Sequence, residues 1–111
     1  MYRHAAFALI AFTALVLSAC DDSTGITAED IACPTTPTLT YANFGAAVIE
    51  ANCLECHASR ERPNLNTQAE VGAESASIIA AAVYHSSMPD GGAMTNELRI
   101  QLGQWLTCGA P

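Results

Sequence analysis

Three residues close together in the sequence could hold a metal-containing cofactor. Cys53, Cys56 and His57 form the pattern C-x-x-C-H. In this pattern each thiol can bond to a vinyl group on one edge of a porphyrin, and the histidine that follows can ligate the iron. The pattern therefore predicts one covalently attached haem c, with His57 as the proximal ligand.

The same cysteines are compatible with two other kinds of chemistry. C-x-x-C also occurs in zinc sites and in thiol redox enzymes. A thioredoxin-like enzyme needs a βαβ context, which this sequence lacks. A zinc site needs a fourth ligand, which only His85, Cys33 or Cys108 could offer. Zinc binding or disulfide pairing is the alternative to haem.

Haem iron in electron carriers usually has a second axial ligand, and three downstream residues are candidates. Met88 lies within the sequence Ser-Met-Pro-Asp-Gly-Gly, whose proline and glycines are typical of a loop. His85 is the runner-up, and it would give a bis-histidine haem of lower potential. Met94 is the weaker alternative, because it adjoins the start of the last predicted helix. We expect Met88 to be the distal ligand.

Apolar side chains at helical spacing predict three helices around this motif. The first begins after Thr40, the second at a cap formed by Ser75, and the third runs from about Asn96 to Leu106 after a cap at Thr95. Their apolar faces comprise Tyr41, Phe44, Gly45, Val48 and Ile49; Ile78, Ile79, Ala82 and Val83; and Leu98, Leu102, Trp105 and Leu106. No segment alternates like a strand. The predicted fold class is all-α, with three to four helices around one haem.

Residues 41–111 resemble the class I c-type cytochromes, which carry one haem. An aromatic residue and a glycine (Phe44, Gly45) precede C-x-x-C-H, a Met-Pro loop follows, and the last helix carries an aromatic residue, Trp105. The resemblance implies a small cytochrome c-like fold in which Gly45 lets the first and last helices cross closely against Trp105. It also implies that the carbonyl of Pro63 holds the imidazole of the proximal histidine.

Residues 1–19 predict a signal peptide. Fifteen of them are apolar and Arg3 is the single cation of the short N-terminal region. The apolar run is too short to cross a hydrocarbon layer of about 30 Å. Residues 17–20, Leu-Ser-Ala-Cys, resemble the bacterial lipoprotein box, which implies cleavage before Cys20 and its acylation. Ordinary secretion is the alternative. We therefore expect an exported protein, anchored by lipid to a bacterial membrane, with its domain in the periplasm or at the cell surface.

Residues 20–40 predict a lipidated cysteine followed by a flexible tether rich in Ser, Thr, Asp and Pro. Once Cys20, Cys53 and Cys56 are assigned, Cys33 and Cys108 remain, and an even remainder in an oxidising compartment predicts a disulfide between them. Two independent free thiols are the alternative.

The chain is acidic and poor in large aliphatic residues. Its net charge is −7, and residues 20–111 contain only 16 Leu, Ile, Val and Phe. So few aliphatic residues predict that something else supplies part of the core. The acidity argues against nucleic acid as a partner. It favours redox proteins with a basic docking patch, although acidic residues can equally serve solubility.

The predicted function is that of a membrane-anchored electron carrier, not an enzyme, although it could be a subunit of a larger oxidoreductase. One alternative is a haem-based sensor or catalytic subunit with an open distal site. The other is a structural lipoprotein whose cysteines form disulfides or hold zinc.

Overall fold

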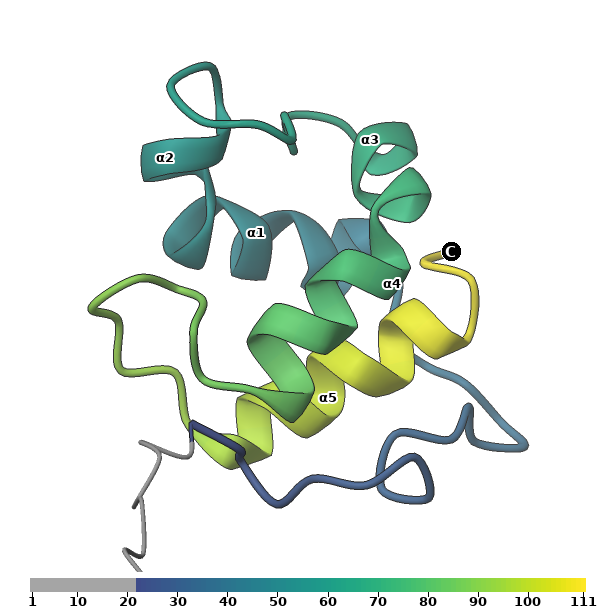
Figure 1. Cartoon of the computed structure of the whole chain (residues 1–111). Helices are drawn as coiled ribbons and strands as arrows, with labels where there is room; N and C mark the ends of the chain where they lie inside the picture. Colours follow the sequence, from purple (N-terminus) through teal and green to yellow (C-terminus); the bar gives the residue numbers. More distant parts are fainter. Residues whose placement is uncertain (1–21) are drawn as a thin grey trace, which may run out of the picture.

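The computed structural model describes residues 22–111, and this part of the chain is helical (Figure 1). In chain order the elements are η1 (Tyr41–Gly45), α1 (Ala46–Asn52), α2 (Leu54–His57), α3 (Gln68–Ala73), α4 (Ser75–Ile78), η2 (Ile79–Tyr84) and α5 (Asn96–Thr107). Within it, extended pairing is limited to one isolated bridge between Ser23 and His85. The predicted all-α class is confirmed. The expected signal peptide and Cys20 lie outside the described residues.

Two of the three predicted helix starts are confirmed by their caps. The Thr40 hydroxyl accepts a hydrogen bond from the Asn43 backbone N–H (3.1 Å), and the Asn43 side chain accepts one from the Thr40 N–H (2.7 Å). The Thr95 hydroxyl accepts from the Leu98 N–H (3.2 Å). Each bond satisfies a backbone donor that the first helical turn leaves unpaired.

The predicted cap at Ser75 is wrong, because the helical region starts earlier. Thr67 and Glu70 form a reciprocal capping box that begins α3, with the Thr67 hydroxyl accepting from the Glu70 N–H (3.2 Å). The helix breaks at Glu74 and resumes as α4. Ser75 is the first residue of α4, and its hydroxyl donates to the Gly72 carbonyl (2.9 Å).

The first and last helices cross at Gly45 and Trp105, as the resemblance implied. A Cβ atom at Gly45 would overlap the Trp105 ring, so only glycine leaves room for this crossing. The Trp105 side chain is completely buried and packs against the rings of Tyr41 (centroids 6.3 Å apart) and Phe44 (6.1 Å). This aromatic cluster fixes η1 and α1 on α5.

Residues 22–40 pack against the helices and differ in this from the flexible tether expected of them. In Figure 1 this segment runs beneath α5. Ile31 is buried against Gly103, where a Cβ would lie 2.9 Å from the Ile31 Cβ, and Cys33 forms a disulfide with Cys108 at the end of α5. The predicted disulfide is confirmed. The segment is ordered because two of its residues have partners on a helix about seventy residues away in sequence.

Among the described residues, no helix is both long and apolar enough to cross a membrane.

Candidate functional site

The C-x-x-C-H motif forms the helical turn that follows α1. The Cys53 carbonyl accepts hydrogen bonds from the N–H groups of Cys56 (3.3 Å) and His57 (2.9 Å). Residues at i, i+3 and i+4 lie on the same face of a helix, so this turn presents both thiols and the imidazole to one side. Both cysteines are free, and all three residues are half-buried.

The thiol of Cys53 is in an environment that favours its neutral form. Burial raises its pKa above the usual value for a cysteine. Redox-active C-x-x-C motifs require the opposite, because a lowered pKa makes the attacking thiolate. The burial of the Cys53 thiol therefore does not favour a thiol redox enzyme. Within residues 22–111, no group of three or more His, Cys, Asp and Glu side chains is arranged to hold a metal ion by itself.

The loop after the motif folds back and brings a carbonyl to the histidine. The Leu65 N–H donates to the His57 carbonyl (2.9 Å), the Leu65 side chain is buried, and the Asn66 amide donates to the Ala58 carbonyl (2.7 Å). These contacts place the Pro63 carbonyl 2.9 Å from His57 Nδ1. The expected contact between Pro63 and His57 is present.

This hydrogen bond decides which nitrogen of His57 can act as a ligand. A carbonyl oxygen only accepts, so Nδ1 must carry the proton and Nε2 presents its lone pair. Histidines that bind metals are commonly held in this way by a carbonyl or carboxylate on the other ring nitrogen. The residues present thus fit an axial ligand held in a fixed tautomer.

The three candidates for the distal ligand lie in different surroundings. Met88, in the loop between η2 and α5, is half-buried and packs partly against the core. The His85 side chain is 52% exposed, and its Nδ1 lies 3.2 Å from the carboxylate of Asp22. Met94 is buried in the core. Of the three, Met88 alone is neither a core side chain nor in contact with a charged group at the surface.

The backbone of Met88 is held from two sides. Its N–H donates to the Ala81 carbonyl on η2 (3.0 Å), and its carbonyl accepts from the guanidinium of Arg99 on α5 (2.8 Å). Arg99 is 3% exposed and also donates to the carbonyls of Ala82 (2.6 Å) and Met94 (3.2 Å). It therefore connects both ends of the Met88 loop to η2.

Sequence reasoning missed Arg99, although a signal was present. Arg99 lies three residues before Leu102 and seven before Leu106, within the apolar face of the predicted helix. Burial lowers the pKa of Arg99, yet a guanidinium remains protonated in proteins. Because its three acceptors are all carbonyls, it acts as a cationic crosslink between backbone segments.

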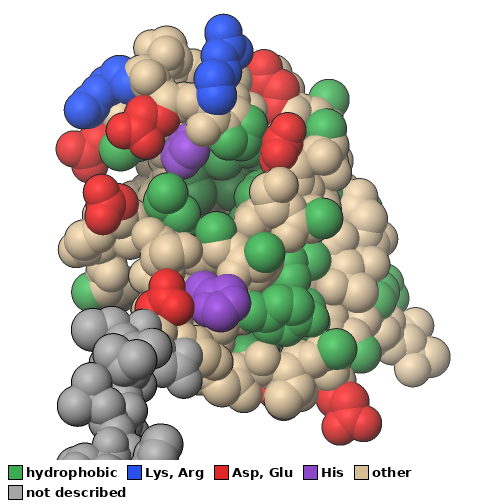
Figure 2. All heavy atoms as spheres, in the orientation of Figure 1, with side chains coloured by type: hydrophobic (Ala, Val, Ile, Leu, Met, Phe, Trp, Pro, Cys, Tyr) green, Lys and Arg blue, Asp and Glu red, His purple; other side chains and the backbone are tan. Residues whose placement is uncertain are grey.

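One face of the molecule combines a hydrophobic hollow with charged side chains at its rim (Figure 2). Half-buried hydrophobic residues packed on the core include Cys53, Leu54, Ile79, Tyr84 and Met88. Arg60 and Arg62 are the exposed arginines of the described part of the chain, and they follow the C-x-x-C-H motif directly.

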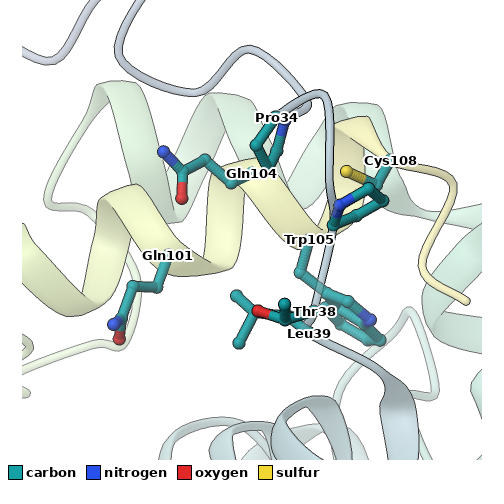
Figure 3. A pocket seen from close by; sticks show the side chains of 8 residues that line it. Pro34, Thr38, Leu39, Gln101, Gln104, Trp105 and Cys108 are labelled. Atoms are coloured by element: carbon teal, nitrogen blue, oxygen red, sulfur yellow. The ribbon is translucent and has the colours of Figure 1, made fainter.

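A separate pocket of about 170 Å³ lies beside the disulfide (Figure 3). Its walls include Leu39 from the N-terminal segment and Gln101, Gln104 and Trp105 from α5. Ligand pockets usually have volumes of roughly 300 Å³ or more. None of the predicted haem ligands lines it, so we do not assign it a role in cofactor binding.

The structure brings Cys53, Cys56, His57 and Pro63 together and places Met88 in a different segment, the loop between η2 and α5. Acylation of Cys20 concerns a residue outside the described range. No protein-family model, no curated protein and no solved structure matches this chain, so its functional interpretation depends on the motif and on the geometry around it.

Proposed function

We propose that this protein is a membrane-anchored, monohaem c-type cytochrome that carries single electrons between redox partners at a periplasmic or outer-membrane surface. The observation that carries the proposal is the hydrogen bond from His57 Nδ1 to the Pro63 carbonyl, beside two free thiols on the same helical turn. A haem bound there would supply an iron that changes between Fe(III) and Fe(II) by one electron.

Each residue has a defined role in this proposal. Cys53 and Cys56 would hold the haem c through thioether bonds, and His57 would ligate the iron through Nε2. The Pro63 carbonyl keeps the imidazole in one orientation and one tautomer. Met88 would be the distal ligand, with His85 as the runner-up. A Met/His ligand pair raises the reduction potential relative to a bis-histidine pair.

The haem would also explain the composition of the core. The chain after the predicted signal peptide contains few large aliphatic side chains for its length, and several hydrophobic residues near the motif are only half-buried. A porphyrin packed on them would cover apolar surface at about 25 cal/mol for each Å² removed from water. It would also lower the polarity around the iron, which contributes to its potential.

The proposed partners are redox proteins that present a basic docking surface. The net charge of −7 would speed the encounter with such a surface, and the effect would weaken as salt is added. Retention in the membrane would come from acylation of Cys20, as the lipoprotein-like sequence implies.

The proposal is tested by producing the full chain in a bacterium that has haem-attachment machinery. We expect a red protein that keeps its haem stain after denaturing electrophoresis and shows low-spin spectra with the far-red band of Met–Fe(III) ligation. Met88→Ala should remove that band. Met94→Ala and His85→Ala, which change the other two candidates, should keep it.

Other spectra would lead to other functions. Loss of low-spin character in His85→Ala but not in Met88→Ala would identify a bis-histidine haem. A high-spin protein that binds carbon monoxide would indicate a sensor or catalytic subunit with an open distal site. A folded but colourless protein would overturn the haem proposal and leave zinc or disulfide chemistry.

A further inference from the structure

The start of the described chain pairs with the residues that lead into the Met88 loop. The Thr24 N–H donates to the Tyr84 carbonyl (2.9 Å), and the Ser86 N–H donates to the Asp22 carbonyl (2.8 Å), so the two backbones run antiparallel. The Thr24 hydroxyl adds a bond to the Val83 carbonyl (2.6 Å). We call these paired residues, 22–24 and 83–86, the anchor edge.

Several contacts hold residues 22–24 in this position. The Asn96 side chain donates from α5 to the Thr24 carbonyl (3.2 Å), and the Asp22 carboxylate contacts His85. Further along, the buried Ile31 and the disulfide of Cys33 fasten the same segment to α5. A segment held at so many points cannot act as a flexible spacer between an anchor and the domain.

Because residues 22–24 are held on the domain, the distance between the domain and an acylated Cys20 is short. Under the proposed function, on which this inference rests, Cys20 carries the acyl chains, and Asp21 alone separates it from the paired Asp22. Two Cα–Cα steps of about 3.8 Å each limit that separation to about 7.6 Å. A free coil of twenty residues would instead have an average span of roughly 25 Å.

We propose that the anchor edge is the membrane-facing surface of the protein and that its partner there is the bilayer itself. The Met88 loop then lies on the membrane side, while α2 and α3 lie at the opposite end of the molecule (Figure 1). An electron partner that docks near the Met88 loop must therefore be embedded in, or bound to, the same membrane.

Charge attraction does not hold this surface to the lipid. The exposed side chains on and beside the anchor edge include the acids Asp22 and Glu97, the second of which follows Asn96, the residue that contacts Thr24. Acidic groups are repelled by anionic headgroups, so the orientation comes from the short covalent link. It should consequently be insensitive to ionic strength, unlike that of a protein adsorbed through basic residues.

The test compares two exposed alanines at opposite ends of the molecule. Ala93→Cys, in the Met88 loop, and Ala73→Cys, at the end of α3, are each given a nitroxide label in the full-length lipidated protein. The protein is placed in phosphatidylethanolamine/phosphatidylglycerol vesicles with and without a nickel-chelating lipid. Because the haem contributes equally to both samples, the change in nitroxide relaxation on adding nickel reports distance from the bilayer surface.

We expect the nickel-dependent relaxation to be several-fold larger at position 93 than at position 73, in low and in high salt. Inserting about ten Gly and Ser residues between Asp21 and Asp22, which span roughly 17 Å as a flexible coil, should greatly reduce the difference. Equal relaxation at the two positions, or a larger effect at position 73, would overturn the inference.

The same samples separate this inference from the proposed function. A colourless protein that sediments with the vesicles would refute electron transfer. Its orientation would then be decided by labelling variants in which Cys53 and Cys56 are replaced by serine, so that only the introduced cysteine carries the nitroxide. A red protein that fails to sediment would show that Cys20 bears no anchor, and would overturn the membrane-facing surface together with the anchored part of the proposal.

Discussion

Arg99 is the buried charged side chain of the described core, and it has no carboxylate partner among its hydrogen bonds. Replacing it with methionine keeps much of the volume but leaves the carbonyls of Ala82, Met88 and Met94 without their donor. Buried acceptors that lose a donor cost about 1–3 kcal/mol each when water cannot replace it. We expect Arg99→Met to lower the free energy of unfolding by about 2–4 kcal/mol in urea titrations.

The same variant has a spectroscopic consequence that a purely structural role would not produce. Under the proposed function, a Met88 loop freed from Arg99 should weaken the far-red Met–Fe(III) band while the haem stain persists. Arg99→Lys should restore part of the band, because an ammonium can still donate to one or two carbonyls. Arg60→Met changes an exposed arginine and is the control; an equal loss of stability there would contradict the role assigned to Arg99.

At the scale of the elements, the crossing of the first and last helices depends on the lack of a side chain at Gly45. In Gly45→Ala, the new methyl group would overlap the Trp105 ring, so the helices must separate or the ring must move. Overpacking of this kind costs about 1–3 kcal/mol. The variant should unfold at correspondingly lower urea concentration.

Gly72→Ala makes the same substitution at a position where we expect the free energy of unfolding to rise instead of fall. Gly72 lies in α3, and a Cβ there would have no atom within 4 Å. Alanine in a helix is favoured over glycine by about 0.5–1 kcal/mol, so this variant should be slightly more stable. If both alanine variants shifted the urea midpoint of unfolding in the same direction, the close contact between Gly45 and Trp105 would not be what determines the effect of Gly45→Ala.

Local signals in the sequence predicted some elements well and long-range packing much less well. Thr40 and Thr95 were identifiable as caps because capping involves residues only three positions apart. Thr67 and Glu70 carry the same kind of signal, but the apolar face that identifies the helix begins only after Ser75, so the helix was predicted to start there. Residues 22–40 show no periodicity, and their order depends on α5, which local patterns do not encode.

In the candidate site, too, local sequence patterns identify some residues, while the role of others depends on long-range packing. The spacing of Cys53, Cys56 and His57 identifies the motif directly, and the resemblance to a family suggested Pro63 as the partner of the imidazole. Arg99 was not identified because an arginine on a helix is normally exposed, and its burial depends on three carbonyls from two other segments.

At the scale of the whole molecule, the disulfide closes a loop across a sequence separation of 75 residues. In the chain-entropy model a loop of this length stabilises the folded state by about 4–5 kcal/mol, and measured values are often smaller. We expect Cys33→Ser/Cys108→Ser to unfold at markedly lower urea concentration than the wild-type protein. A mild thiol reductant should produce the same shift in wild type. Under the proposed function it should do so without releasing haem, since thioether bonds are not reduced by thiols.

Comparing the double-serine variant with Ile31→Ala separates the contribution of the disulfide to stability from that of the packing of the N-terminal segment. Ile31→Ala removes the side chain buried against Gly103 but keeps the disulfide, and it should cost about 2–5 kcal/mol as other buried Ile→Ala changes do. A double-serine variant with unchanged stability would mean that Ile31 and the anchor edge alone hold the segment in place.

The 75-residue separation between Cys33 and Cys108 also imposes an order of events in time. Under the proposed function the chain is exported N-terminus first, so Cys33 emerges before Cys53 and Cys56, and its partner Cys108 emerges last. Until Cys108 emerges, the thiols available to Cys33 include those of Cys53 and Cys56, which are not its native partners. Attachment of haem to Cys53 and Cys56 before α5 arrives would remove both competitors, so cofactor attachment would protect the chain from mispairing. Cells unable to attach haem should therefore accumulate disulfide-scrambled protein rather than a folded apoprotein.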